Sequence, residues 1–223
     1  MEIPSFSSGT ASRFCDEDKA KVKTATAFFR DRLVAHGFDN REPWNSQVIA
    51  KYTAQHLLGC NRKGLAIFGA PGRGKTAAMR VFGKMRGVRM AGARDIVEEF
   101  RKHTDNRNDF WAWIRNQYIT GHDPFWRDLI IDDIGTEPTL NEYGTKQEVI
   151  DSVINNRYEA LMNDEALTLM TFNLPMEPVS NAAPADSIRG RYGERFLSRV
   201  HEMCHVVHFR GPDWRQTPTE EGQ

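Results

Sequence analysis

The segment Leu65-Ala-Ile-Phe-Gly-Ala-Pro-Gly-Arg-Gly-Lys-Thr76 joins a short apolar run to a loop that contains three glycines and ends in Lys-Thr. Its second part, Gly69–Thr76, fits the pattern G-x-x-x-x-G-K-[ST]. The apolar run before it and the spacing of Met79 and Phe82 after it predict a strand, a turn and a helix in that order. Glycines in such a turn let successive backbone N–H groups face one anion at the start of the helix. The segment therefore predicts a phosphate-binding loop.

Two polar side chains at the end of this loop define its expected chemistry. Lys75 supplies an ammonium group for the β and γ phosphates of a nucleotide, and the Thr76 hydroxyl is placed to bind Mg²⁺. The residues expected to surround the phosphates are Gly69, Ala70, Pro71, Gly72, Arg73, Gly74, Lys75, Thr76 and Ala77. Arg73 is expected to be exposed to solvent rather than catalytic. A glycine-rich turn without a ligand is the alternative.

A second motif, Asp128-Leu-Ile-Ile-Asp-Asp-Ile-Gly-Thr-Glu137, puts two carboxylates at the end of an apolar run. Unpaired carboxylates are costly to bury, and the carboxyl ends of parallel strands line the ligand crevice of such sheets. We therefore expect Asp132 to bind Mg²⁺ and Asp133 to orient or deprotonate the attacking water. Glu137 is a weaker candidate for the second role. The alternative is an Asp-Asp turn that only caps the next segment.

Asn173 and three arginines are further candidates for the same site. Asn173 follows another apolar run, which places its amide where it can hold the water or the γ phosphate; a turn asparagine is the alternative. Arg191, Arg195 and Arg199 are spaced every four residues and are expected to share one helix face. One interpretation is a basic helix face exposed to solvent. The other is that an arginine of this face contacts the γ phosphate bound to a neighbouring subunit, because negative charge builds up on the phosphoryl oxygens in the transition state.

The rest of the chain alternates apolar runs with helical periodicity. Helices are expected over 18–36, 43–59, 76–85, 93–103, 141–163 and 188–202, and strands over 65–68, 87–90, 128–134, 167–172 and 206–209. Strands separated by helices predict an α/β fold with a mostly parallel, doubly wound sheet. The expected domains are a loose tail at 1–16, a helical segment at 17–59, the α/β core at 60–215 and a loose tail at 216–223.

The composition narrows the class of protein. The chain has 223 residues, 39% hydrophobic and 27% charged, which excludes collagen-like and wholly disordered classes. Lys+Arg and Asp+Glu are both 30, so a nucleic-acid contact has to come from a local patch. No run approaches the roughly 18 apolar residues that span a bilayer, and the N-terminus resembles no signal peptide, so we expect a cytoplasmic protein without a membrane partner. Cys15, Cys60 and Cys204 lack metal-ligand spacing and are expected to be reduced thiols.

Together these motifs resemble a family, the AAA+ ATPases of the DnaC/IstB type, which includes bacterial and phage helicase loaders and transposition helper ATPases. The resemblance covers about residues 45–215 and rests on an ordered set of segments: GAPGRGKT, LIIDDIGTEP, VIDSVINNRYEA, LMTFNLP, RYGERFLSRV and FRGPDWR. It implies a P-loop NTPase fold with a five-stranded parallel sheet between helices. It also assigns Walker A to Lys75 and Thr76, Walker B to Asp132 and Asp133, sensor 1 to Asn173, and the inter-subunit arginine finger to Arg199, assisted by Arg195.

The resemblance also implies a function. ATP and Mg²⁺ are expected to bind between subunits and to drive self-association, with slow hydrolysis that a partner or DNA stimulates. The implied partners are a hexameric replicative helicase and single-stranded DNA. Only residues 211–223 follow the last expected strand, too few for a C-terminal helical lid, which is typical of the loader branch. The short region before the loop leaves the helicase contact to residues 18–59 or to another part of the chain.

Three other functions remain open at this point. An IstB-like transposition helper ATPase shares the same motifs and would engage a transposase. A P-loop kinase of a small metabolite needs the same loop and acidic strand end, but the Asn173 and Arg199 pattern disfavours it. A nucleotide-gated binding module would hold ATP without useful hydrolysis, and Asp133 argues against it.

Aromatic residues alternate with basic ones between Lys102 and Arg127. They are Phe110, Trp111, Trp113, Tyr118, Phe125 and Trp126, interleaved with Arg107, Arg115 and His122. Aromatic faces and guanidinium groups hold unpaired bases and phosphates of single-stranded DNA. Such a density of Trp and Phe is also typical of a core, and the sequence favours the core.

Overall fold

The structure is a computed structural model of the chain, and it describes residues 16–35, 43–58, 63–103, 105–114, 128–142, 145–162, 166–178, 183, 186–213 and 215. Its elements in chain order are α1 (Asp16–Ala35), α2 (Pro43–Leu57), β1 (Gly64–Phe68), α3 (Lys75–Arg86), β2 (Arg89–Gly92), α4 (Ala93–Lys102), α5 (Arg107–Ile114), β3 (Leu129–Ile134), β4 (Leu140–Glu142), β5 (Thr145–Gln147), α6 (Val149–Met162), β6 (Thr168–Phe172), α7 (Ile188–Tyr192), α8 (Glu194–Met203) and β7 (Cys204–His208). None of the helices within these ranges is long and apolar enough to cross a membrane.

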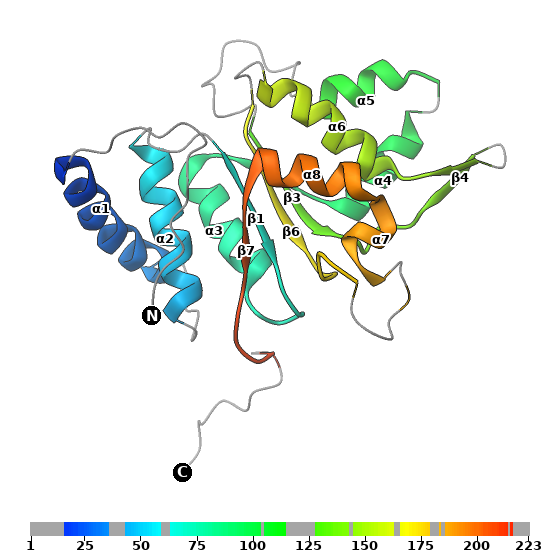
Figure 1. The fold of residues 1–223 in the computed structure, drawn as a ribbon. Helices are drawn as coiled ribbons and strands as arrows, with labels where there is room; N and C mark the ends of the chain where they lie inside the picture. The colour runs from blue at the N-terminus through cyan, green and yellow to red at the C-terminus, as the bar shows by residue number, and fades with distance from the viewer. Residues whose placement is uncertain are drawn as a thin grey trace.

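Five of the strands form one parallel sheet in the order β2-β3-β6-β1-β7 (Figure 1). β6 is the middle strand, β1 lies between β6 and β7, and β3 lies between β2 and β6. Because all five strands run the same way, the turns that follow β1, β3 and β6 meet at one edge of the sheet. The predicted α/β fold, a five-stranded parallel sheet between helices, is confirmed.

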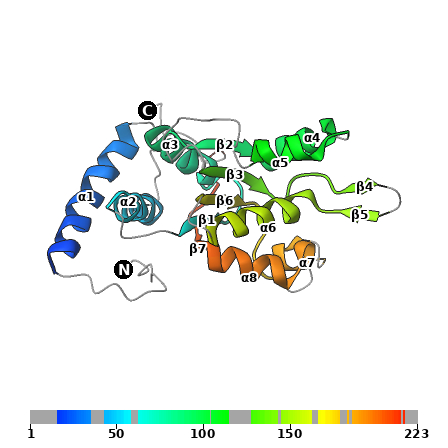
Figure 2. The same cartoon turned by 90° about the horizontal axis from the view of Figure 1, so that it is seen from above.

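Helices cover both faces of the sheet (Figure 2). Leu65 and Ile67 of β1 pack into an apolar cluster with residues of α2 and α3. Ala66, between them in sequence, belongs to the cluster on the other face, which α4, α5, α6 and α8 complete. Because both faces are buried, the inner strands β1, β3 and β6 are nearly continuous apolar runs instead of alternating ones. This explains why the sequence revealed them so clearly.

The N-terminal helices share one of these clusters. Leu33 of α1 and Trp44 and Val48 of α2 are buried in the same cluster as Leu65 of β1. α1 and α2 lie side by side at one side of the molecule in both views (Figures 1 and 2). Helices α1 and α2, which fall in the helical segment expected at 17–59, therefore pack in the same apolar cluster as α3 and β1.

The predicted helix over 141–163 is wrong at its beginning. α6 starts only at Val149, and the residues before it form a hairpin in which Leu140 pairs with Gln147 and Glu142 with Thr145. The hairpin projects from the body (Figure 2). The sequence before Val149 is polar and contains Gly144, which lowers helix propensity, so these residues satisfy their backbone groups by cross-strand pairing.

The predicted helix over 188–202 is interrupted. Gly193 has φ 86°, a conformation that ends α7 and starts α8. Arg191 consequently lies on α7, whereas Arg195 and Arg199 lie on α8, so the expectation that all three share one helix face is wrong. α5 was not predicted, because its eight residues give too short a periodic pattern.

Several predictions concern residues outside the described part of the chain. These are the tail at 1–16 except for Asp16, which begins α1, the tail at 216–223, the thiols of Cys15 and Cys60, and the side chains of Arg115, Tyr118, His122, Phe125 and Trp126. The third cysteine, Cys204, is described: its buried thiol donates to the carbonyl oxygen of Thr168 at 3.3 Å, and burial raises its pKa.

Candidate functional site

The glycine-rich loop connects the carboxyl end of β1 to the first turn of α3. Gly72 and Gly74 have φ values of 77° and 82°, which residues with a side chain rarely adopt. Gly74 precedes α3 and provides no side-chain cap, so the first N–H groups of the helix face the loop without a side-chain acceptor at that position. A helix start of this kind attracts anions.

Lys75 is held inside this loop. Its side chain is 4% exposed, and its ammonium donates to the carbonyl oxygens of Gly69 at 2.8 Å and Ala70 at 3.0 Å. Burial, the largest cause, lowers the pKa of Lys75 from its ordinary value to about 8. Two carbonyl groups of the loop therefore position a cation whose charge is only weakly solvated, and an anionic ligand in the loop can compensate for that burial.

Asp132 stands where β3 meets the loop. Its Oδ1 accepts hydrogen bonds from the Thr76 hydroxyl at 3.1 Å and from the Thr171 hydroxyl at 2.5 Å. Burial raises the pKa of Asp132, and these hydrogen bonds act in the opposite direction. The carboxylate at the end of β3 and the hydroxyl at the start of α3, which the sequence analysis expects to bind one Mg²⁺, are therefore in direct contact.

Asp133 points into the same region although it directly follows Asp132. Successive residues of a strand point to opposite faces, but Asp133 has φ 59°, and the pairing of β3 with β6 shifts register between Ile131 and Ile134. The backbone N–H of Asp133 donates to the Thr171 hydroxyl oxygen at 2.8 Å, and the Asn173 amide donates to Asp133 Oδ1 at 2.8 Å. The irregular strand end thus brings both carboxylates and Asn173 together.

The donor set fits Mg²⁺ held jointly with a nucleotide. A hydroxyl and a carboxylate are hard oxygen donors, and Mg²⁺ commonly binds through one or two carboxylates plus substrate phosphates instead of an all-protein cage. The described residues contain no group of three or more His, Cys, Asp and Glu side chains that could hold a metal ion by themselves. Asp132 and Thr76 are the residues that would bind the ion.

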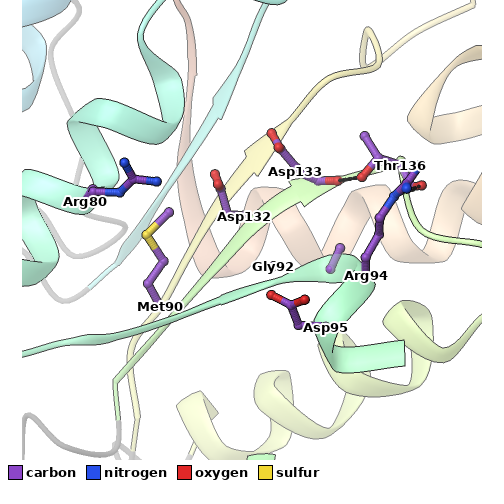
Figure 3. Close-up of a pocket in the computed structure, with 9 residues that line it drawn as sticks. Arg80, Met90, Gly92, Arg94, Asp95, Asp132, Asp133 and Thr136 are labelled. Carbon is purple, nitrogen blue, oxygen red and sulfur yellow. Dashed lines mark hydrogen bonds between the residues drawn. The ribbon is translucent and has the colours of Figure 1, made fainter. Parts of the chain in front are cut away.

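Two adjoining cavities surround these side chains. The smaller, about 380 Å³, is lined by Pro71, Gly72, Gly74, Lys75, Thr76, Ala77, Arg80, Asp133, Asn173 and Arg215. The larger, about 750 Å³, lies between the start of α4 and the end of β3, and Figure 3 shows Asp132 and Asp133 facing it beside Arg80 and Arg94. Asp133 and Arg80 line both cavities, so the two are neighbours.

Three residues of this site were missed by the sequence analysis. Thr171 lay within a quoted motif, but only the structure shows its hydroxyl between Asp132 and the N–H of Asp133. Arg80 is four residues after Thr76, so the helical spacing of α3 could have placed both on one side. Arg215 ends the quoted segment FRGPDWR, but its place beside the loop depends on how the chain after β7 returns to it.

Arg73 is half-buried, which corrects the expectation that it is exposed to solvent. Its Nη1 donates to the carbonyl oxygen of Phe209 at 3.0 Å and lies 3.1 Å from His208 Nε2. His208 stacks on Phe68 of β1, with ring centroids 4.7 Å apart. Through these two contacts, Arg73 links the glycine-rich loop to the end of β7.

Glu137 is not available to a water in either cavity. Its side chain is 1% exposed and forms an ion pair with Arg191 at 3.0 Å, and the Tyr192 hydroxyl donates to the same carboxylate. Arg191 also donates to the carbonyl oxygens of Gly135 at 2.7 Å and Glu137 at 2.6 Å. Glu137, the weaker candidate for water activation, is thus buried against α7. Its contacts with Arg191 and Tyr192 stabilise the turn after β3.

Arg199 lines neither cavity of its own chain. It lies between α8 and α6, where its guanidinium donates to Asn155 Oδ1 and its Cζ is 5.4 Å from the ring centroid of Tyr158. Arg195, one turn earlier, is exposed. The structure therefore does not bring these arginines to Lys75 of the same chain.

The described aromatic residues of the candidate DNA segment belong mostly to the core. Phe110 is fully buried and contacts Phe100, with ring centroids 5.0 Å apart. Trp111 and Trp113 are half-buried against the same cluster, and Arg89 lies 4.4 Å over the ring of Trp113. For Phe110 the core prediction is confirmed.

This parallel sheet between helices, with the glycine-rich loop that follows β1, defines an α/β fold with a candidate phosphate-binding site. Among solved structures, the chain is similar to the crystal structure of the DnaC helicase loader, with 21% sequence identity and a TM-score of 0.54. The match covers 80% of this chain and 99% of that chain. No protein-family model matches the chain, and a search of curated protein sequences finds no match. The family resemblance seen in the sequence is therefore supported by the fold.

Proposed function

We propose that this protein binds and hydrolyses ATP with Mg²⁺ and acts as a loader of a replicative DNA helicase. The observation that carries the proposal is the contact network in which Thr76, Asp132, Thr171, Asp133 and Asn173 meet at the ends of three strands. This network stands beside a glycine-rich loop with an inward-held lysine, on the fold of the DnaC helicase loader.

Each side chain has a definite task in this proposal. Lys75 exchanges the carbonyl oxygens of Gly69 and Ala70 for phosphate oxygens, and the N–H groups at the start of α3 face the same anion. Asp132 and Thr76 hold the metal ion. When bound, Mg²⁺ neutralises charge that develops on the phosphate oxygens.

Asp133 and Asn173 act on the water. The hydrogen bond from the Asn173 amide fixes the Asp133 carboxylate, and both line the cavity that Lys75 and Thr76 also line. A fixed carboxylate orients the attacking water and accepts its proton as the phosphorus–oxygen bond forms. This arrangement favours an ATPase over a binding module without hydrolysis.

The transition state needs a further cation, and we assign it to Arg199 of a second copy of the chain. Arg199 is remote from the site of its own chain, and the exposed Arg195 precedes it on the same helix. A guanidinium that stabilises charge on the transferred phosphoryl group can be worth 10³–10⁵ in rate, roughly, in related systems. ATP bound at such an interface between two copies of the chain would couple hydrolysis to self-association.

The proposed partners are a hexameric replicative helicase and single-stranded DNA. The helicase assignment rests on the fold shared with the DnaC helicase loader. Among the described residues, the half-buried Trp111 and Trp113 are the candidates for contact with unpaired bases. Arg89 lies over the ring of Trp113, and Arg107 lies over the ring of the neighbouring Phe100.

One experiment tests the function as a whole. Purified protein and its Lys75→Ala variant are assayed for Mg²⁺-dependent ATP hydrolysis with and without single-stranded DNA, and each is then used with ATP to retain proteins from a host lysate. We expect hydrolysis and retention of a replicative helicase by the wild-type chain alone. Retention of a transposase would instead assign the transposition-helper function, and failure of the wild-type chain to bind ATP would refute the proposal.

A further inference from the structure

Helix α7 is attached to two strand ends of the site, those of β3 and β6. On the side of β3, Arg191 donates to the carbonyl oxygens of Gly135 and Glu137 and pairs with the Glu137 carboxylate. On the side of β6, two N–H groups in the first turn of α7 donate to the carbonyl oxygens of Pro175 and Met176, at 2.9 and 3.1 Å. The same short helix is therefore fixed to both turns at once.

The turn after β3 is fixed to Asp133. The hydroxyl and the N–H of Thr136 both donate to the carbonyl oxygen of Asp133, at 2.8 and 3.2 Å, and Figure 3 shows the hydroxyl bond beside the larger cavity. The Glu137 carboxylate accepts from the N–H of Gly135 at 2.9 Å. The buried Glu137 side chain thus closes a short turn directly after the carboxylate that is proposed to orient the water.

The same cluster extends to α8, the helix that carries Arg199. Tyr192, whose hydroxyl donates to Glu137, stacks on the fully buried Phe196 of α8, with ring centroids 4.5 Å apart. Burial, and next to it Glu137, raises the pKa of Tyr192, so the hydroxyl keeps the proton that it donates. Gly193 joins the two helices with φ 86°, and among the described residues no atom lies within 4 Å of a Cβ position there. The stack therefore connects the turn after β3 with α8 across this joint.

We propose that Arg191 and Glu137 are positioning residues that couple the end of β3, with its water-orienting Asp133, to the position of Arg199 on α8 of the same chain. The inference rests on the proposed function, because it requires Asp133 and Arg199 to act in hydrolysis. Neither positioning residue lines the two cavities. Because Arg199 serves the site of a second copy, the cluster connects one ATP site to the next.

The kinetics and the ATP affinity of Arg191→Lys test this inference. Lysine keeps the charge but has no planar fork, so it cannot hold two carbonyl oxygens and the Glu137 carboxylate together. We expect an unchanged dissociation constant for Mg-ATP by isothermal titration calorimetry and a kcat that is roughly 10- to 100-fold lower, the effect of misplacing a reacting group by about 1 Å. Arg189→Lys is the matched control, because Arg189 lies on the same helix but pairs with the exposed Glu177 and Glu194. It should keep the wild-type kcat.

Mixed assemblies separate coupling from a local role. Arg191→Lys is mixed with Asp133→Ala and, separately, with Arg199→Ala. If Arg191 placed only Arg199, Asp133→Ala chains would supply a correct arginine to the variant's site and restore hydrolysis. If Arg191 placed only Asp133, the variant would supply its own Arg199 to the site of Arg199→Ala chains and restore hydrolysis. Coupling predicts recovery in neither mixture, because the variant is defective in both roles.

The outcomes separate this inference from the proposed function. Recovery in either mixture, or a wild-type kcat for Arg191→Lys, would overturn the coupling while hydrolysis by the wild-type chain stands. A mixture of Asp133→Ala with Arg199→Ala is expected to recover and so to show that chains exchange. No recovery there, or no hydrolysis by the wild-type chain, would refute the shared site and this inference with it.

Melting temperatures without nucleotide check the folding of each variant. If Arg191→Lys melts early, Tyr192→Phe decides, because it keeps the ring on Phe196 and removes only the hydroxyl that donates to Glu137. Its kcat is expected to fall roughly three- to tenfold, the effect of one hydrogen bond, again without recovery in either mixture. A wild-type kcat for Tyr192→Phe would then overturn the inference.

Discussion

The affinity for ATP is expected to fall steeply as the pH rises through about 8, the pKa of Lys75 in the buried loop. Only the ammonium form attracts phosphate, and burial lowers the pKa of Lys75 from its ordinary value of 10.5, so the charge is lost within the accessible pH range. With a pKa of about 8, about nine tenths of the chains carry the charge at pH 7 and about one tenth at pH 9. The dissociation constant should therefore rise about tenfold between these pH values.

The direction of the proton movement gives a second measurement. ATP stabilises the charged form, so binding raises the pKa of Lys75, and between about pH 8 and 9 the complex takes up a proton that the free protein lacks. Calorimetric titrations in buffers of different ionisation enthalpy measure this uptake directly. Lys75→Arg is the matched control, because guanidinium stays charged at pH 9. A dissociation constant that does not change from pH 7 to 9, without proton uptake, would refute the argument.

Other predictions concern the subunit seam and the interior. Arg199→Ala is expected to bind ATP and lose turnover, and mixing it with Asp133→Ala should restore part of the hydrolysis, because mixed assemblies contain interfaces with both groups intact; no recovery would contradict a shared site. Glu137→Gln leaves Arg191 and Tyr192 without their buried carboxylate, so urea unfolding should show a loss of about 3 kcal/mol, and a loss below about 1 kcal/mol would rule out a structural role. Phe110→Ala should lower the free energy of unfolding by about 3–5 kcal/mol, whereas native stability with weakened DNA binding would speak for a surface role.

Local patterns predicted the main elements well. The glycine-rich loop needs a strand before it and a helix after it, and the structure has β1 and α3 at those places. The strands were recognisable because both faces of the sheet are covered, which requires continuous apolar runs. The order of strands and helices then limits the fold to a parallel sheet between helices.

The errors occurred where a local pattern competed with long-range contacts. Hydrophobic periodicity predicted that the helix begins before Val149, where the structure has a hairpin. It also predicted one helix where the structure has α7 and α8, because periodicity does not detect a glycine with φ 86° between them. The role considered for Glu137 failed for a related reason. Glu137 was considered because it ends the acidic segment that begins at Asp128, but Arg191, from a helix far along the chain, forms an ion pair with its carboxylate.

The sequence by itself determined the class of fold and the chemistry available at one edge of the sheet, because the loop, the acidic strand end and the apolar strands are local patterns. Tertiary structure alone decided which side chains meet there. Asp132 and Asp133 face one site only because β3 becomes irregular against β6, and Arg215 reaches the loop only because Asn45 of α2 holds the chain at Arg210. Both depend on hydrogen bonds between residues distant in sequence, which no periodicity encodes.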